Sequence, residues 1–153
     1  MADVTIWDIA SGVKTTWAAA SSLTAIIPAN RLYLGRAAEE TPLPYCVFTF
    51  NDVSAYFGGT EYFSGSKYLK VTRVNFEMYG TKDVDWSSLG QAISDVFGWS
   101  SSDPNASWSI PNATVLDAMP EVEALEIADP RQDGQDIIKY SSSITVKMEA
   151  DRG

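Results

Sequence analysis

The side chains of this sequence that could carry out chemistry are nearly all carboxylates. The chain has no histidine and one cysteine, Cys46, so it lacks the commonest general base and the usual ligands of structural zinc. Carboxylates crowd one stretch, which consists of Glu121, Glu123, Glu126, Asp129, Asp133 and Asp136. Such groups could form a glycosidase-like pair or an oxygen-ligand metal site, but their spacing matches no calcium loop. Because charge runs are usually solvated, we interpret the stretch as a surface acidic patch.

Other catalytic signatures are missing as well. The sequence contains neither a G-x-S-x-G nucleophile turn nor a glycine-rich phosphate-binding motif. Its tightest glycine cluster, Gly58 and Gly59 with Gly65, lies between two predicted strands, and no helix follows to offer its N-terminus to a phosphate. We therefore predict a protein that is not an enzyme and that holds no cofactor and no catalytic metal.

Aromatic residues around that glycine turn indicate contact with another protein. They are Tyr56, Phe57, Tyr62 and Phe63. The side chains of one hairpin arm cannot all reach the core, and clustered exposed aromatic side chains are typical of partner interfaces. We predict a subunit or partner interface at these four residues. The alternative is that the rings pack back over their own domain.

Length, composition and charge limit the class of protein further. The 153 residues are 45% hydrophobic and 20% charged, which suits a single globular domain over residues 1–153. A net charge of −9 disfavours binding to nucleic acid or to an anionic membrane. Residues 1–5 lack the features of a signal peptide, and no run reaches the ~18 apolar residues of a membrane span. We expect Cys46, inside an apolar run, to be a buried free thiol.

The first helical pattern lies near the amino terminus. Apolar residues recur at three- and four-residue steps, which places Ile6, Ile9, Ala10, Val13, Trp17 and Ala20 on one helix face. Asp3 or Thr5 can cap the start of this helix, and Pro28 limits its continuation.

The second helical pattern runs from Trp86 to Phe97, with its apolar residues again along one stripe. Asp83 or Asp85 can cap its start by accepting a backbone hydrogen bond. Gly98 is predicted to end it in the left-handed conformation.

Strands account for most of the remaining sequence. We predict them at residues 31–36, 45–50, 68–79, 122–128 and 138–148, the last two joined by a hairpin. The alternation of residues 72–78 changes parity at Leu69 and Val71, which suggests a bulge or a diverging outer segment. In the last strand, Ile144 points to the core and Ser143 to water. The predicted fold is α+β, with a mainly antiparallel sheet, two helices packed on one face and an extended aromatic hairpin.

The order of these elements resembles the tail terminator (tail completion) family of long-tailed bacteriophages. The likeness covers nearly the whole chain, and no motif in it is catalytic. It rests on the amino-terminal helix, Arg31-Leu-Tyr-Leu-Gly-Arg36, Thr41-Pro-Leu-Pro-Tyr-Cys-Val-Phe48, Val74-Asn-Phe-Glu-Met-Tyr79, the helix of residues 85–97 and the closing hairpin that ends at residues 140–148.

The resemblance implies a structural virion protein that assembles into a homo-oligomeric, hexameric ring. Such a ring caps the tail tube protein and joins the tube to the head-neck connector or stopper protein. DNA would pass through it without specific binding, and the acidic patch is a candidate for the wall of that lumen. The location implied is the tail and neck of the virion, with assembly in the host cytoplasm and no membrane partner.

Two other interpretations stay open from the sequence. A head-closure or tail-tube subunit of the same assembly would have more strand and less helix. The other is a carboxylate-dependent enzyme or a free-standing binding domain, and a monomer with a carboxylate-lined cleft would favour the enzyme.

Overall fold

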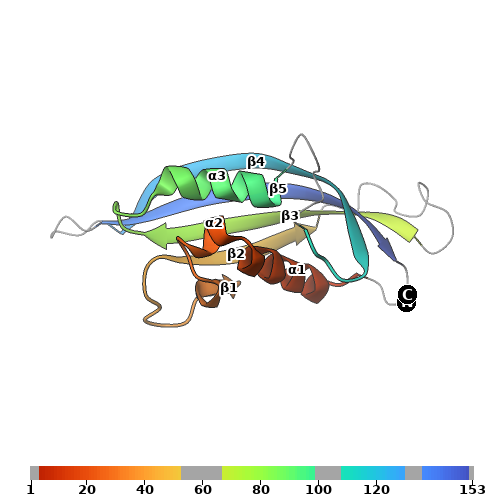
Figure 1. Cartoon of the computed structure of the whole chain (residues 1–153), viewed down its shortest axis with the longest axis horizontal. Helices are drawn as coiled ribbons and strands as arrows, with labels where there is room; N and C mark the ends of the chain where they lie inside the picture. The colour runs from red at the N-terminus through yellow and green to blue at the C-terminus, as the bar shows by residue number, and fades with distance from the viewer. Residues whose placement is uncertain (1–3, 53–66, 99–107, 130–135, 152–153) are drawn as a thin grey trace.

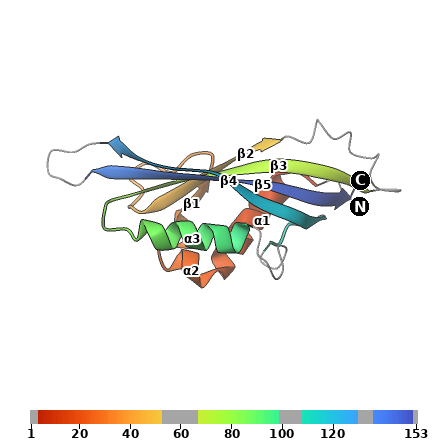
Figure 2. The same ribbon diagram turned by 90° about the horizontal axis from the view of Figure 1, so that it is seen from above.

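The computed structural model of this chain describes residues 4–52, 67–98, 108–129 and 136–151, in which helices cover one face of a sheet (Figures 1 and 2). The helical segments are α1 (Ile6–Ala19), α2 (Ser21–Thr24), a short 3-10 turn (Ala29–Arg31) and α3 (Trp86–Phe97). The strands are β1 (Leu32–Leu34), β2 (Tyr45–Asp52), β3 (Lys67–Gly80), β4 (Ala113–Asp129) and β5 (Ile137–Asp151).

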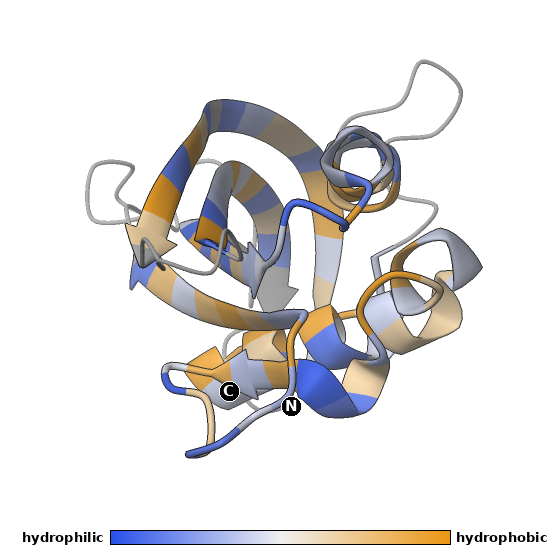
Figure 3. Ribbon diagram, turned by 90° about the vertical axis from the view of Figure 1, so that its left-hand side faces the viewer, coloured by the Kyte–Doolittle hydropathy of each residue, from blue (hydrophilic) through white to orange (hydrophobic). Residues whose placement is uncertain are grey.

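The described strands form one sheet in the order β1-β2-β3-β5-β4. β1 runs parallel to β2, and the other neighbours are antiparallel. Seen end-on, the strands twist strongly across the sheet (Figure 3). The α+β class, the mainly antiparallel sheet and the helices on one face confirm the fold predicted from the sequence. The predicted aromatic hairpin lies outside the described residues.

The start of α1 is fixed by a reciprocal pair of hydrogen bonds. The Asp8 backbone N–H donates to Thr5 Oγ1 at 3.2 Å, and the Thr5 backbone N–H donates to Asp8 Oδ2 at 2.8 Å. This capping box satisfies two N–H groups that have no partner inside the helix. Ile9 and Trp17 are buried as the helical pattern predicts, but Ile6 is 52% exposed. Ile6 therefore does not belong to the core.

Helix α3 begins at a side-chain cap and ends at a glycine that close packing requires. Asp85 caps the first turn, since its Oδ1 accepts from the Ser88 backbone N–H at 3.1 Å. The predicted left-handed conformation of Gly98 is wrong, because its φ is −87° and its ψ is −178°. Glycine is needed here for space: a Cβ atom would lie 2.5 Å from the Ser94 carbonyl oxygen and 2.8 Å from Pro120 Cγ.

An aromatic cluster between sheet and helices forms the centre of the core. The Phe76 ring lies 6.0 Å from Trp17 and 4.9 Å from Phe97, centroid to centroid. Trp17 Nε1 donates to the Ile27 carbonyl oxygen at 3.0 Å, so the buried indole N–H is satisfied. Cys46 is fully buried, as predicted, and burial raises the pKa of its thiol well above the usual value.

The irregular strand is β4 and not β3. β3 keeps one continuous register with β5, so the bulge predicted near Val71 is absent; Val71 and Thr72 are both buried. Register shifts occur in β4 between Val115 and Asp117, Pro120 and Val122, and Ile127 and Asp129. β4 also begins at Ala113, well before the predicted start at residue 122. Each bulge breaks the alternation by which a strand is detected in sequence.

The register of β5 predicts how the domain responds to a buried charge. Ile144 is fully buried on the helix side, so Ile144→Asp should lower the free energy of unfolding by about 4 kcal/mol or more, because it buries an unpaired carboxylate. Thr49→Asp places the same group on an exposed strand position and should cost less than about 1 kcal/mol. Chemical denaturation of both variants measures the difference. Equal losses would contradict the assigned faces.

Candidate partner-binding surfaces

The predicted aromatic interface falls outside the part of the chain that the structure describes. Tyr56, Phe57, Tyr62 and Phe63 all lie in the segment 53–66, so the interface stays a prediction. Asp133 also lies outside the described residues. Asp129 is the last residue of β4, and Asp136 is a half-buried residue just before β5.

The structure does not gather the acidic residues of β4 on one face. Glu126 is paired in register with Lys139, and Glu123 with Ser142, so the two point to opposite faces of the sheet. Glu123 is on the helix side, where its carboxylate accepts a hydrogen bond from the Tyr140 hydroxyl. Glu121, at a bulge, and Glu126 are on the other face. Whether any of them faces a lumen stays a prediction.

The sheet face opposite the helices, here called the open face, is polar and hollowed. Polar side chains lie side by side in rows across β2, β3 and β5. The rows are Asn51, Arg73 and Thr145; Thr49, Asn75 and Ser143; and Glu77 with Ser141. All of these residues except Thr145 line a hollow of about 460 Å³, together with Phe76, Glu121 and Ser142.

The middle of the open face is less exposed than its sequence suggests. Ser143, predicted to face water, is 7% exposed. The hydroxyl oxygens of Ser143 and Thr145 are buried, with no hydrogen-bond partner among the described residues. Ser143 points away from the helices as predicted, but its short side chain lies at the bottom of the hollow between longer neighbours.

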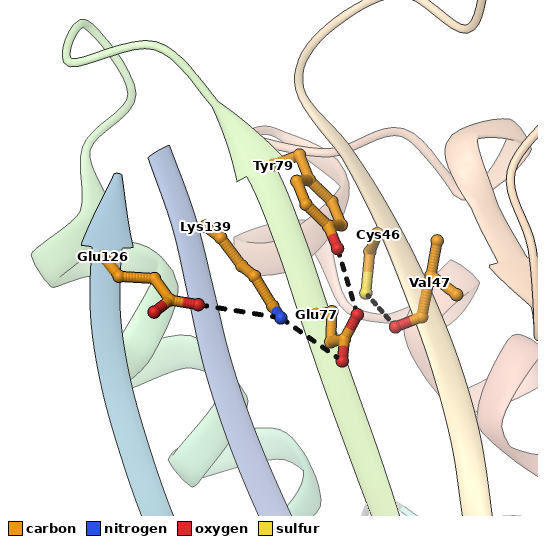
Figure 4. A network of polar contacts seen from close by, with 6 residues as sticks. All are labelled: Cys46, Val47, Glu77, Tyr79, Glu126 and Lys139. Carbon is orange, nitrogen blue, oxygen red and sulfur yellow. Dashed lines mark hydrogen bonds and ion pairs between the residues drawn. The ribbon is translucent and has the colours of Figure 1, made fainter. Parts of the chain in front are cut away.

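Charges at one end of the open face pair with one another (Figure 4). Lys139 Nζ lies 3.7 Å from a carboxylate oxygen of Glu77 and 3.7 Å from one of Glu126, so one cation links β3, β5 and β4. The Tyr79 hydroxyl donates to Glu77 Oε2 at 3.0 Å. These groups are partly exposed, so each ion pair contributes at most about 1 kcal/mol. Their effect is to fix the side chains, while the single cation offsets one of the two carboxylate charges.

Burial and the hydrogen bond to Glu77 raise the pKa of Tyr79 to about 12. The anionic form is disfavoured by burial and by the neighbouring carboxylate. Glu121 forms a further pair on this face, with its Oε2 3.0 Å from Arg73 Nε.

A second hollow lies on the helix side, where α3 begins beside β4 and β5. Its volume is about 400 Å³, and it is lined by Trp86, Ser87, Glu123, Ala124, Leu125 and Tyr140. The Trp86 and Tyr140 rings stack with centroids 6.2 Å apart. Leu125 is 58% exposed beside them. Sequence patterns did not predict this site, because its residues come from three elements far apart in the chain.

The described residues contain no group of three or more Cys, Asp or Glu side chains placed to hold a metal ion. None of the described helices is long and apolar enough to cross a membrane.

Comparison with solved structures defines the class of fold. The chain is similar to a chain of the "Virion of native gene transfer agent (GTA) particle", with a TM-score of 0.59 and 12% sequence identity. The match covers 92% of this chain and 93% of that chain, so the two share a fold over nearly their whole lengths. No protein-family model matches the sequence, and no curated protein matches it.

The raised pKa of Tyr79 predicts a dependence of stability on alkaline pH. A tyrosine whose pKa is raised from 10.0 to about 12 on folding contributes stability that is complete below pH 10 and is lost as the pH rises towards 12. Tyr79→Phe should remove this part of the decline. The difference in tyrosinate absorbance between wild type and variant should titrate near pH 12. A difference that titrates near pH 10 would contradict the hydrogen bond to Glu77.

Proposed function

We propose that this chain is a structural protein of a phage-like virion, and within it the tail terminator. In this role it forms a ring, with six copies expected, that caps the tail tube and joins it to the head-neck connector. The observation that carries the proposal is the likeness over 92% of the chain to a component of the gene transfer agent virion. The order of elements that resembles the tail terminator family supports the same role.

The arrangement of charged groups supports a structural role over an enzymatic one. Glu121, Glu123 and Glu126 are held by Arg73, Tyr140 and Lys139 respectively, and they lie on two faces of the sheet. A pair of carboxylates that flanks a substrate must converge on one cleft. We therefore propose that the acidic residues shape the surface and the electrostatic field of the ring. We also propose that the protein is not an enzyme.

The helix layer bears on the choice among ring proteins of the neck and tail. A head-closure or tail-tube subunit is expected to contain more strand and less helix. Here α1 and α3 span 14 and 12 residues and lie on the same face of the sheet (Figure 2). This layer favours the terminator. The net charge of −9 suits a lumen that repels phosphate and lets DNA pass without binding.

Electron microscopy with tail tubes tests the proposed role. Purified protein should appear as rings, and adding it to assembling tail tube protein should cap tube ends and shorten the tubes, because a bound ring blocks further addition. Ile144→Asp, used at a temperature at which circular dichroism shows it unfolded and the wild type folded, is the negative control. Tubes of unchanged length with uncapped ends, in the presence of folded protein, would contradict the terminator role. Rings built into the tube wall would indicate a tube subunit.

The predicted aromatic interface gives a separate test. Joint replacement Phe57→Ser and Phe63→Ser should preserve the circular dichroism spectrum and weaken assembly, because aromatic anchors commonly contribute ~2 kcal/mol or more each at interfaces. If the rings pack on their own domain instead, the melting temperature should fall first. A folded double variant that assembles and terminates tubes normally would end this interface hypothesis.

A further inference from the structure

Two large apolar side chains at the start of α1 point into solvent. Trp7 is 71% exposed and Ile6 is 52% exposed; we call this pair the apolar tip. The hydrogen bonds between Thr5 and Asp8 hold the first helical turn, so the tip is presented by a fixed backbone. Adjacent exposed apolar side chains of this size are typical of a surface that another protein covers.

The hollow at the start of α3, which we call the socket, has the complementary shape and chemistry. Its wall is the stacked pair Trp86 and Tyr140, and Leu125 lies at its rim. Gly90 leaves room for the polar pair beside it, since a Cβ atom there would lie 2.7 Å from the Tyr140 hydroxyl and 3.3 Å from Glu123 Oε1. The socket therefore combines apolar rings with one carboxylate.

The tip fits the socket in size and polarity. The socket encloses about 400 Å³, which is room for an indole ring. A buried tryptophan needs an acceptor for its Nε1–H, and the Glu123 carboxylate has lone pairs beyond the one that Tyr140 uses.

The tip and the socket lie at opposite ends of the molecule. In Figure 1 the first turn of α1 is towards the right, whereas the first turn of α3 and the adjoining ends of β4 and β5 are towards the left. Contacts between these two different patches can run head to tail, which generates a closed ring or an open filament, or can pair two copies about a two-fold axis with each tip in the other copy's socket. The proposed ring requires the head-to-tail arrangement.

We propose that the apolar tip of one copy inserts into the socket of the next copy and forms the subunit contact of the ring. This inference rests on the proposed ring. A second copy is the occupant because both halves of the contact are present on one chain and match each other. Ile127, also exposed on the helix side of β4, extends the apolar surface of the socket along the same strand.

Complementation between two variants tests the contact. Trp7→Arg destroys the tip and keeps the socket, whereas Leu125→Arg blocks the socket and keeps the tip. Both positions are exposed, so both variants should keep the wild-type circular dichroism spectrum. Each alone should sediment as a 16.7 kDa monomer. Mixed in equal amounts they should form a dimer of one copy each, because one intact tip meets one intact socket and no further growth is possible.

Two control variants introduce the same charge nearby. Thr15→Arg on α1 and Thr114→Arg on β4 change exposed positions outside the tip and socket and should assemble as the wild type does. If Trp7→Arg and Leu125→Arg still form rings, or if both are monomers whose mixture gives no dimer, the contact is wrong while the proposed ring stands. A wild-type protein that is monomeric at every concentration overturns both.

Discussion

The structure depends on burying one face of a twisted sheet under helices through a cluster of aromatic rings. Phe76 of β3 contacts Trp17 of α1 and Phe97 of α3, so the central strand is the point at which both helices are fixed. Because side chains alternate along a strand, this burial also decides which residues face away from the helices. The polar rows of the open face and the Lys139 network thus follow from the register of the core.

The edge strand β4 shows most clearly what this one-sided burial leaves uncovered. It is an edge strand of 17 residues whose register shifts let it stay paired with β5 along its length. Its exposed Leu125 and Ile127 are on the face that α3 covers only in part. A long edge strand with uncovered apolar side chains favours aggregation of a monomer. In a subunit that must bind its neighbour, the same strand provides a binding surface.

Local signals in the sequence predicted much of this fold. Thr5, Asp85 and the alternation around Ile144 act over a few residues, and the structure follows each of them. The first half of β4, the geometry of Gly98 and the burial of Ser143 were not predictable in this way, because they depend on bulges, close packing and sheet curvature. The socket assembles from distant elements, and its only sequence signal was an aromatic residue at a helix start.

Native mass spectrometry of the purified protein shows whether the subunits close into a ring. One dominant species is expected at a sixfold multiple of the 16.7 kDa subunit, unchanged as the protein concentration is varied. A closed ring has no free tip or socket at which to grow, so larger species should be absent. A spectrum of monomers alone, or a ladder of masses that lengthens with concentration, would contradict it.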